Sequence, residues 1–102
     1  MNKGFWVISY DIPNDKRRRQ VCRIMEGHGR RAQYSVFECE LTPERRDRLE
    51  KLLLRVIDDV EDDVRFYPLN RADLQRVVLL GRAVIRREPD HYIVSEDDAH
   101  PF

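Results

Sequence analysis

The order of strand-like and helix-like segments predicts an α+β fold in which two helices cover one face of a sheet. Three observations support this prediction: an aromatic and β-branched run near the start of the chain, two segments with apolar residues at helical spacing, and further strand segments between and after them. The resulting order of strand, helix, strand material, helix, strand and strand favours a two-layer sandwich. With 102 residues, the chain has the length of one compact domain.

The first strand is expected at residues 5–10, where the run FWVISY is aromatic and β-branched and lacks helical periodicity. We expect both of its faces to be largely covered, which makes it a central strand. Pro13, Asn14 and Asp15 then form a turn, and Asn14 or Asp15 caps a helix over residues 16–28. The buried side of this helix is expected to consist of Val21, Ile24, Met25 and His28.

Residues 31–41 alternate in the manner of a strand, but two arrangements remain open for them. A split βαβ arrangement needs two strands between its helices, whereas residues 30–41 supply only twelve residues. Either a tight bend near Tyr34 and Ser35 produces a short hairpin, or one long bent strand occupies the space.

Thr42 and Pro43 predict the start of a second helix, as its N-cap and its first helical residue. The helix is expected to continue to about Asp58. Residues 59–63 form an acidic turn, and we expect a solvated turn rather than a calcium loop because the required spacing and glycine are missing. The apolar stripe of the helix consists of Leu49, Leu52, Leu53, Val56 and Ile57.

The last segments predict two more strands. Residues 63–69 read as a strand in which Pro68 marks an end or an edge, and residues 70–75 as a short helix or loop. Residues 77–80 are expected to form a fifth strand whose apolar edge invites pairing with a second copy. We therefore divide the chain into a domain over residues 1–85 and a polar C-terminal tail over residues 86–102.

Charge is balanced in total but not along the chain. The 19 basic and 19 acidic residues cancel, so the net charge predicts no partner. Residues 16–31, however, contain seven cations and one acid, and residues 40–63 contain nine acids and five cations. The first segment therefore suits a polyanion and the second repels one. Sixteen of the 19 basic residues are Arg, which suits bidentate phosphate contact, although a high-GC genome produces the same excess.

The cysteines and the apolar segments indicate a soluble protein of the cytoplasm. Cys22 and Cys39 form no C-x-x-C pair and the histidines are scattered, which favours two free thiols over a zinc site. The apolar run at residues 5–10 is too short for the core of a signal peptide, and no stretch approaches membrane-spanning length. We expect no contact with a membrane.

Four blocks of sequence, in this order and spacing, resemble the CRISPR-associated Cas-two family: YDIPNDKRRRQV, GRRAQYSVFECELT, DDVRFYPL and VVLLG. Together with the strand before the first block they span residues 5–81. The resemblance implies a ferredoxin-like βαββαβ fold and a homodimer in which the added fifth strand is exchanged between partners. It also implies Mg²⁺-dependent cleavage of phosphodiester bonds in RNA or DNA, and a role beside the Cas-one integrase in spacer acquisition.

The resemblance also implies roles for individual residues. Asp11, which closes the first strand, is the implied catalytic acid and metal ligand. Nucleic-acid binding is implied for the basic helix positions Arg17, Arg18 and Arg19, for Arg31 (with Arg30 as the alternative), and for Ser35. The supporting residues are Tyr10 and Phe37.

Each of these roles has a structural alternative. Asp11 could be a turn residue that accepts hydrogen bonds from the amides of Asn14 or Asp15. The arginines of residues 17–19 could form a solvated helix start, Ser35 could bond only to neighbouring backbone, and Tyr10, Phe37 and Trp6 suit a core or an interface better than base stacking. One carboxylate also holds Mg²⁺ poorly, which a dimer would remedy by bringing a second copy of Asp11 close to the first.

Two functions from different classes are compatible with these residues. The first is a Mg²⁺-dependent endonuclease in which Asp11 binds the metal and arginines bind phosphate. The second is a non-catalytic adaptor, a basic platform that holds duplex DNA for the integrase. The sequence leaves the choice between RNA and DNA open.

Overall fold

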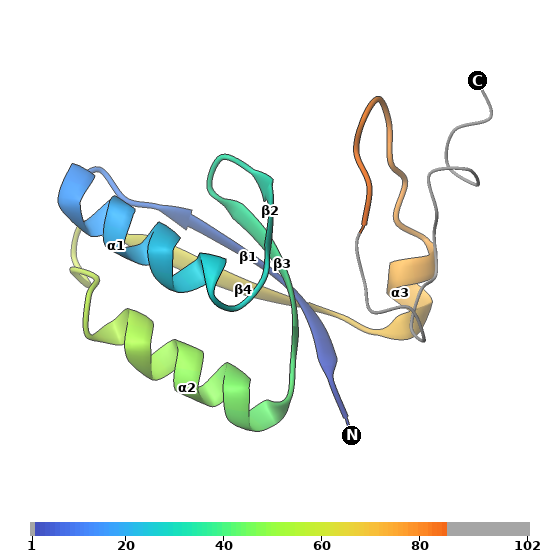
Figure 1. Cartoon of the computed structure of the whole chain (residues 1–102), viewed down its shortest axis with the longest axis horizontal. Coiled ribbons are helices and arrows are strands. Elements are labelled where there is room, and N and C mark those ends of the chain that lie inside the picture. The colour runs from blue at the N-terminus through green and yellow to red at the C-terminus, as the bar shows by residue number, and fades with distance from the viewer. Residues whose placement is uncertain (1, 86–102) are drawn as a thin grey trace.

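The computed structural model describes residues 2–85 as a four-stranded antiparallel sheet with two helices on one face (Figure 1). The strand order is β2-β3-β1-β4, so that a strand lies between the two strands of each βαβ unit, as in ferredoxin-like folds. The predicted tail over residues 86–102 lies outside the described residues. In chain order the elements are β1 (Gly4–Asp11), α1 (Asp15–Glu26), β2 (Arg30–Gln33), β3 (Val36–Leu41), α2 (Pro43–Leu54), β4 (Asp63–Leu69) and α3 (Arg71–Gln75).

The first strand is central, as its composition predicts. β1 pairs with β3 from Gly4 to Ser9 and with β4 from Phe5 to Asp11, and both pairings are antiparallel. β4 lies at one edge of the sheet. Pro68 is thus tolerated within β4, because an edge strand has one side without sheet hydrogen bonds.

The stretch between the two helices is a hairpin of two short strands, so the alternative of one long bent strand is wrong. β2 and β3 are joined by a turn at Tyr34 and Ser35, and their register shifts between Arg31 and Gln33. The chain enters this hairpin through Gly29. A Cβ atom there would collide with Cys39 Sγ and the Glu38 carbonyl oxygen, so only glycine allows this close approach.

Local hydrogen bonds determine where the helices begin and end. The Asn14 side chain accepts a hydrogen bond from the Arg17 amide at 2.9 Å and caps α1, while Thr42 caps α2 in the same way. The prediction that α2 continues to Asp58 is wrong, because it ends at Leu54. Asp58 Oδ1 instead accepts the amides of Val60 and Glu61, which turns the chain. In the part of the chain that the structure describes, no helix is long and apolar enough to cross a membrane.

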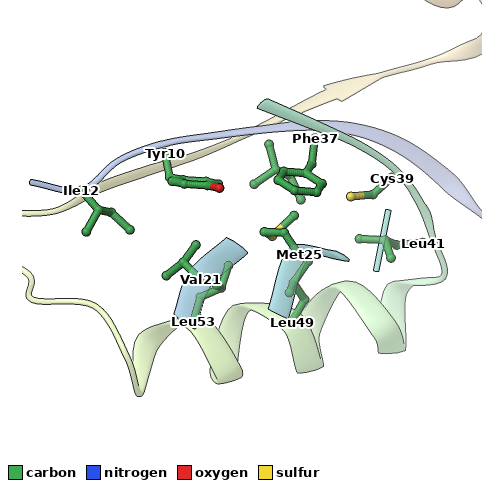
Figure 2. Close-up of a cluster of buried hydrophobic side chains, with 10 residues drawn as sticks. Tyr10, Ile12, Val21, Met25, Phe37, Cys39, Leu41, Leu49 and Leu53 are labelled. Carbon is green, nitrogen blue, oxygen red and sulfur yellow. The ribbon is translucent and has the colours of Figure 1, made fainter. Parts of the chain in front are cut away.

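The main core lies between the sheet and the two helices (Figure 2). Tyr10 from β1 and Phe37 from β3 are buried, and their rings stack with centroids 6.3 Å apart. This confirms the core alternative for both aromatic residues. Of the stripe predicted on α1, Val21 and Met25 are fully buried and Ile24 is partly buried. The buried members are Ile8, Tyr10, Ile12, Val21, Met25, Phe37, Cys39, Leu41, Leu49 and Leu53.

The C-terminal part of the described chain packs separately. Residues 70–75 take the helical alternative, and Leu74 of α3 packs with Phe5 and Ile85 in a second small core. The strand expected at residues 77–80 does not form within residues 2–85. Val78 and Leu80 are each 78% exposed, whereas Val77 and Leu79 between and beside them pack against the second core.

Two leucines of α2 provide a matched test of the core. Leu49 is fully buried, whereas Leu54 is 66% exposed. Leu49→Ala should lower the free energy of unfolding by about 2–5 kcal/mol, because it leaves a cavity in the core. Leu54→Ala should change it by less than about 0.5 kcal/mol. Urea unfolding of both variants gives these values, and equal effects would contradict the position assigned to α2.

Candidate functional site

Alternation along β1 separates its side chains onto two faces of the sheet. Ile8 and Tyr10 point into the core with the helices, so Ser9 and Asp11 lie on the opposite, open face. Residues directly opposite in an antiparallel ladder share a face. Asp11 pairs with Asp63 of β4, and Ser9 pairs with Arg65. Four polar side chains therefore meet on the open face where β1 ends.

These side chains line a pocket of about 250 Å³, which we call the Asp11 pocket. Within residues 2–85, no hydrogen bond or ion pair is formed to the Asp11 side chain, so the turn alternative for Asp11 gains no support. The amide of Arg17 is capped by Asn14 instead. The lining residues are Ser9, Tyr10, Asp11, Asp63, Arg65 and Tyr67.

The second carboxylate of the Asp11 pocket has a fixed partner. Arg65 donates from Nε to Asp63 Oδ1 at 2.9 Å and from Nη2 to Asp63 Oδ2 at 3.0 Å. This guanidinium lowers the pKa of Asp63, and the carboxylate in turn raises the pKa of Arg65. Asp63 is thus held as an ionised carboxylate. Asp11 is the carboxylate of this pocket that is left for an external ligand.

A second, smaller pocket of about 90 Å³ adjoins α1 and contains three arginines. We call it the Arg31 pocket. Within residues 2–85, Tyr10 is the one residue that the linings of the two pockets share, and it lies near the end of β1. Three guanidinium groups around one pocket suit a phosphate group, which carries several acceptor oxygens. The lining residues are Tyr10, Arg18, Arg19, Cys22, Arg31 and Tyr34.

Arg31 is held in place by aromatic rings and by a sulfur atom. Its guanidinium carbon lies 5.7 Å from the ring centroid of Tyr34 and 5.6 Å from that of Phe37, within the range of a cation–π interaction. Its Nη2 lies 2.7 Å from the Sγ of Cys22, which is a free thiol. Burial raises the pKa of Tyr10, the neighbouring Cys22 adds to this rise, and Arg31 opposes it. Tyr10 therefore remains a neutral phenol at physiological pH.

Arg17 lies outside both pockets and is bound to the acidic turn. Its Nε donates to Asp62 Oδ2 at 2.8 Å, and its Nη2 donates to Glu61 Oε1 at 3.2 Å. The turn is exposed at residues 59–61, as expected for a solvated turn, but the Asp62 side chain is an exception and has no exposed surface. Asp62 Oδ2 also accepts the amide of Asp58. With these contacts Arg17 connects α1 to the turn before β4, which favours a structural role for it.

The remaining predicted residues have mixed positions. Arg18 lines the Arg31 pocket but also bonds to Asp15 and to the carbonyl oxygen of Ile12. The carbonyl oxygen of Ser35 accepts the amide of Tyr10 at 3.1 Å, a contact between two backbone groups that does not involve the Ser35 hydroxyl. The structure thus brings Tyr10, Arg18, Arg19 and Arg31 together, and it places Asp11 in a separate pocket.

Reasoning from the sequence missed Asp63 and Arg65 as neighbours of Asp11. The spacing of Asp63 and Arg65 puts both on one face of a strand, and this was visible in the sequence. Their position opposite Asp11 depends on the register between β1 and β4, which joins residues 52 positions apart. A pattern of neighbouring residues in the sequence cannot predict this register.

The donors of the Asp11 pocket fit magnesium better than zinc. Within residues 2–85, no group of three or more His, Cys, Asp or Glu side chains could hold a metal ion. Mg²⁺ commonly binds through one or two carboxylates and completes its shell with water and substrate phosphates. Asp11 would be the protein ligand in this pocket, with Ser9 beside it and Asp63 already held by Arg65.

The fold and the two pockets define a small ferredoxin-like α+β protein with separate acidic and basic surfaces. Residues 4–77 match the family model of CRISPR associated protein Cas2. The chain belongs to this family, which confirms the resemblance seen in the four sequence blocks and the ferredoxin-like fold that it implies.

The match extends over almost the whole length of the individual relatives. The chain is 42% identical over 89 residues to a CRISPR-associated endoribonuclease Cas2 of Synechocystis sp., covering 87% of this chain and 97% of that protein. The crystal structure of Streptococcus pyogenes Cas2 superposes with a TM-score of 0.67 at 34% identity, over 76% of this chain and 99% of that one. A chain of a partial Cas6-RT-Cas1–Cas2 complex gives a TM-score of 0.66 at 27% identity, over 90% and 97%.

The Arg17–Asp62 pair makes stability depend on acid pH. Arg17 lowers the pKa of Asp62 below its ordinary value of 3.8 in the folded protein. The stabilisation is therefore present above this value and is lost as the pH falls through the lowered pKa. Asp62→Asn, which keeps an oxygen acceptor, should be less stable than wild type at neutral pH and should lose less stability below pH 3.8.

Urea unfolding at several pH values measures this difference. Asp47→Asn is the control, because Asp47 is exposed and pairs with Lys51 one turn away on α2. Parallel pH profiles for wild type and Asp62→Asn would show that the ionisation of Asp62 does not contribute to the pH dependence of stability.

Proposed function

We propose that this chain acts in CRISPR adaptation, in the cytoplasm, as a homodimeric Mg²⁺-dependent endonuclease that cleaves RNA or DNA. Family membership supports the pathway, and the Synechocystis relative is named an endoribonuclease. The observation that carries the proposal is the position of Asp11. It ends the central strand on the open face of the sheet, in a pocket, and within residues 2–85 it has no partner for its carboxylate.

Cleavage of a phosphodiester bond requires a positioned water molecule and a neutralised phosphate. The oxygen of the water bonds to phosphorus, the bond from phosphorus to one ester oxygen breaks, and a proton from the water ends on that departing oxygen. When bound, Mg²⁺ would supply charge neutralisation and a more acidic water. Asp11 would bind the ion, and the Asp11 of a second copy would supply the further carboxylate that one subunit lacks.

The Arg31 pocket would bind the nucleic-acid backbone next to the cleavage site. Arg18, Arg19 and Arg31 present cations on the helix side of β1, while Asp11 lies on the open side. Because Tyr10 lines both pockets, a nucleic-acid strand that is bound by the arginines would reach Asp11 by passing around the end of β1. Arg17 contributes to the fold rather than to this surface, since its donors bind Asp62 and Glu61.

The proposed dimer uses residues 77–80, which form no strand within the described chain. Val78 and Leu80 expose apolar side chains, and an extended apolar segment is suited to add to the sheet of another subunit. The Cas1 integrase is the proposed partner of this dimer. The similarity to a chain of a Cas1–Cas2 complex supports this choice.

Replacing the acid tests the nuclease proposal directly. Asp11→Asn removes the charge that would bind Mg²⁺ while keeping the size of the side chain, so cleavage of short labelled RNA, single-stranded DNA or duplex DNA should be abolished. A chelator should abolish wild-type cleavage as well. Asp47→Asn, on the exposed side of α2, should cleave like wild type.

Light scattering should show that Asp11→Asn remains a dimer at micromolar concentration. Undiminished cleavage by Asp11→Asn, or by wild type in chelator, would falsify the nuclease mechanism. A wild-type monomer at this concentration would contradict the dimer.

The second candidate is a non-catalytic adaptor that bridges Cas1 integrase dimers and holds duplex DNA. It is favoured by one observation, namely that the arginine-lined pocket is separate from Asp11. For an adaptor, Asp11→Asn should support spacer acquisition in cells, whereas the double variant Arg18→Glu with Arg19→Glu should abolish it.

The double variant Arg45→Glu with Arg48→Glu is the matched control for this charge reversal. Both arginines are exposed near the start of α2, where acidic residues are favourable. Acquisition that depends on Asp11 and survives reversal at Arg18 and Arg19 would exclude the adaptor.

A further inference from the structure

The cation beside Asp11 is not one of the arginines expected from the basic segment. Among the described residues that line the Asp11 pocket, Arg65 is the only basic one. Arg18, Arg19 and Arg31 line the other pocket, and Arg17 is bound to the acidic turn. A phosphate at Asp11 would therefore meet the guanidinium of Arg65 first.

The β1–β4 register places Arg65 within reach of such a phosphate. Asp11 lies opposite Asp63, and Arg65 lies two residues further along β4 on the same face. Diagonal neighbours of this kind lie about 7–8 Å apart, and their Cβ atoms are somewhat closer. That separation accommodates one phosphate group between the carboxylate of Asp11 and a long side chain, when each forms contacts of about 2.7–2.9 Å.

The contacts of Arg65 orient its guanidinium without using all of its donors. Nε and Nη2 hold Asp63, and this bidentate contact fixes the plane of the group. Nη1 lies 3.5 Å from the Tyr67 hydroxyl, a long contact, and the side chain is 62% exposed. A guanidinium has five N–H donors, so donors remain for an external acceptor.

A phosphate can approach the Asp11 pocket only if a cation offsets the negative charge of its carboxylates. Asp11 and Asp63 together would present two negative charges to an anion, and like charges at this separation repel. Arg65 cancels one of them and raises the local potential on the side of Asp63. The remaining charge on Asp11 is the one that a divalent cation would compensate.

We propose that Arg65 is a phosphate-binding residue of the Asp11 pocket, whose guanidinium donates hydrogen bonds to the phosphate of the bond to be cleaved. Asp63 is then a positioning residue that holds this guanidinium in place. Nothing in the resemblance or in the relatives assigns either role. The inference rests on the proposed function, since it takes Asp11 as the site of cleavage.

Three variants and one matched control test this role by cleavage. Arg65→Ala should lower cleavage by about 100-fold or more, because it removes donors to the reacting phosphate. Arg65→Lys should retain part of the activity, since it keeps the charge but not the planar fork. Arg65→Gln, similar in length and uncharged, should behave like Arg65→Ala. Arg76→Ala should cleave like wild type, because Arg76 is an exposed arginine paired with Asp73 at a comparable spacing but outside the pocket.

Chemical rescue separates phosphate binding from a merely structural role. Guanidinium chloride at low, non-denaturing concentration should restore part of the cleavage by Arg65→Ala and none by Asp11→Asn. A lost fold would show as a shifted urea midpoint and would not be rescued by a denaturant. Wild-type cleavage by Arg65→Ala and Arg65→Gln overturns the proposal, as does activity lost without rescue in a fully folded variant.

A binding measurement decides the case in which the wild-type protein does not cleave and the nuclease proposal fails. Fluorescence anisotropy of a labelled single-stranded RNA is measured against salt concentration for wild type, Arg65→Ala and Arg76→Ala. If Arg65 binds phosphate, Arg65→Ala should reduce the slope of log K against log salt by about 0.7, and Arg76→Ala should not. An unchanged slope for Arg65→Ala overturns the role of Arg65 whether or not Asp11 supports cleavage.

Discussion

The position of β1 between two antiparallel neighbours is the constraint on which the rest of the molecule depends. Its pairing with β3 and β4 directs Ile8 and Tyr10 toward the helices and leaves Ser9 and Asp11 on the open face. A shift of the register by one residue would exchange these two sets and bury a carboxylate in the core. Burial of Ile8 and Tyr10 therefore also keeps Asp11 exposed, because the same alternation governs both.

Arginines that are consecutive in the sequence have different tasks in the structure. Arg17 is bound by the enclosed carboxylate of Asp62 and by Glu61, 45 and 44 residues away. Arg18 combines an ion pair with Asp15 and a bond to the Ile12 carbonyl oxygen, and Arg19 lines the Arg31 pocket. Helical geometry turns successive side chains by about 100°, so Arg17 reaches the acidic turn while Arg18 and Arg19 line the Arg31 pocket. The run of arginines in the sequence therefore does not by itself show what each one binds, because this depends on the face of α1 on which it lies.

Features with local causes could be predicted from the sequence, and features with distant partners could not. The caps at Asn14 and Thr42 depend on a side chain and an amide three residues on, and both were visible in the sequence. The central strand followed from its unbroken apolar and aromatic run. The early end of α2 depends on the turn at Asp58, where hydrogen bonds to two amides compete with a continuing apolar stripe. The pairing of Asp63 with Asp11 requires a strand register, which no composition reveals.

The sheet explains how Asp11, an acid without a side-chain partner among residues 2–85, can exist close to so many cations. An ion pair between Asp11 and a neighbouring arginine would occupy the carboxylate that the proposed Mg²⁺ would bind. β1 prevents this by ending with Tyr10 on one face and Asp11 on the other, so that the arginines near Tyr10 lie in a different pocket. Arg65, the basic residue that lines the Asp11 pocket, already pairs with Asp63, and Arg17 pairs with Asp62 outside that pocket. Separation across a strand thus preserves two opposite charges within one small domain, each of them available to a ligand.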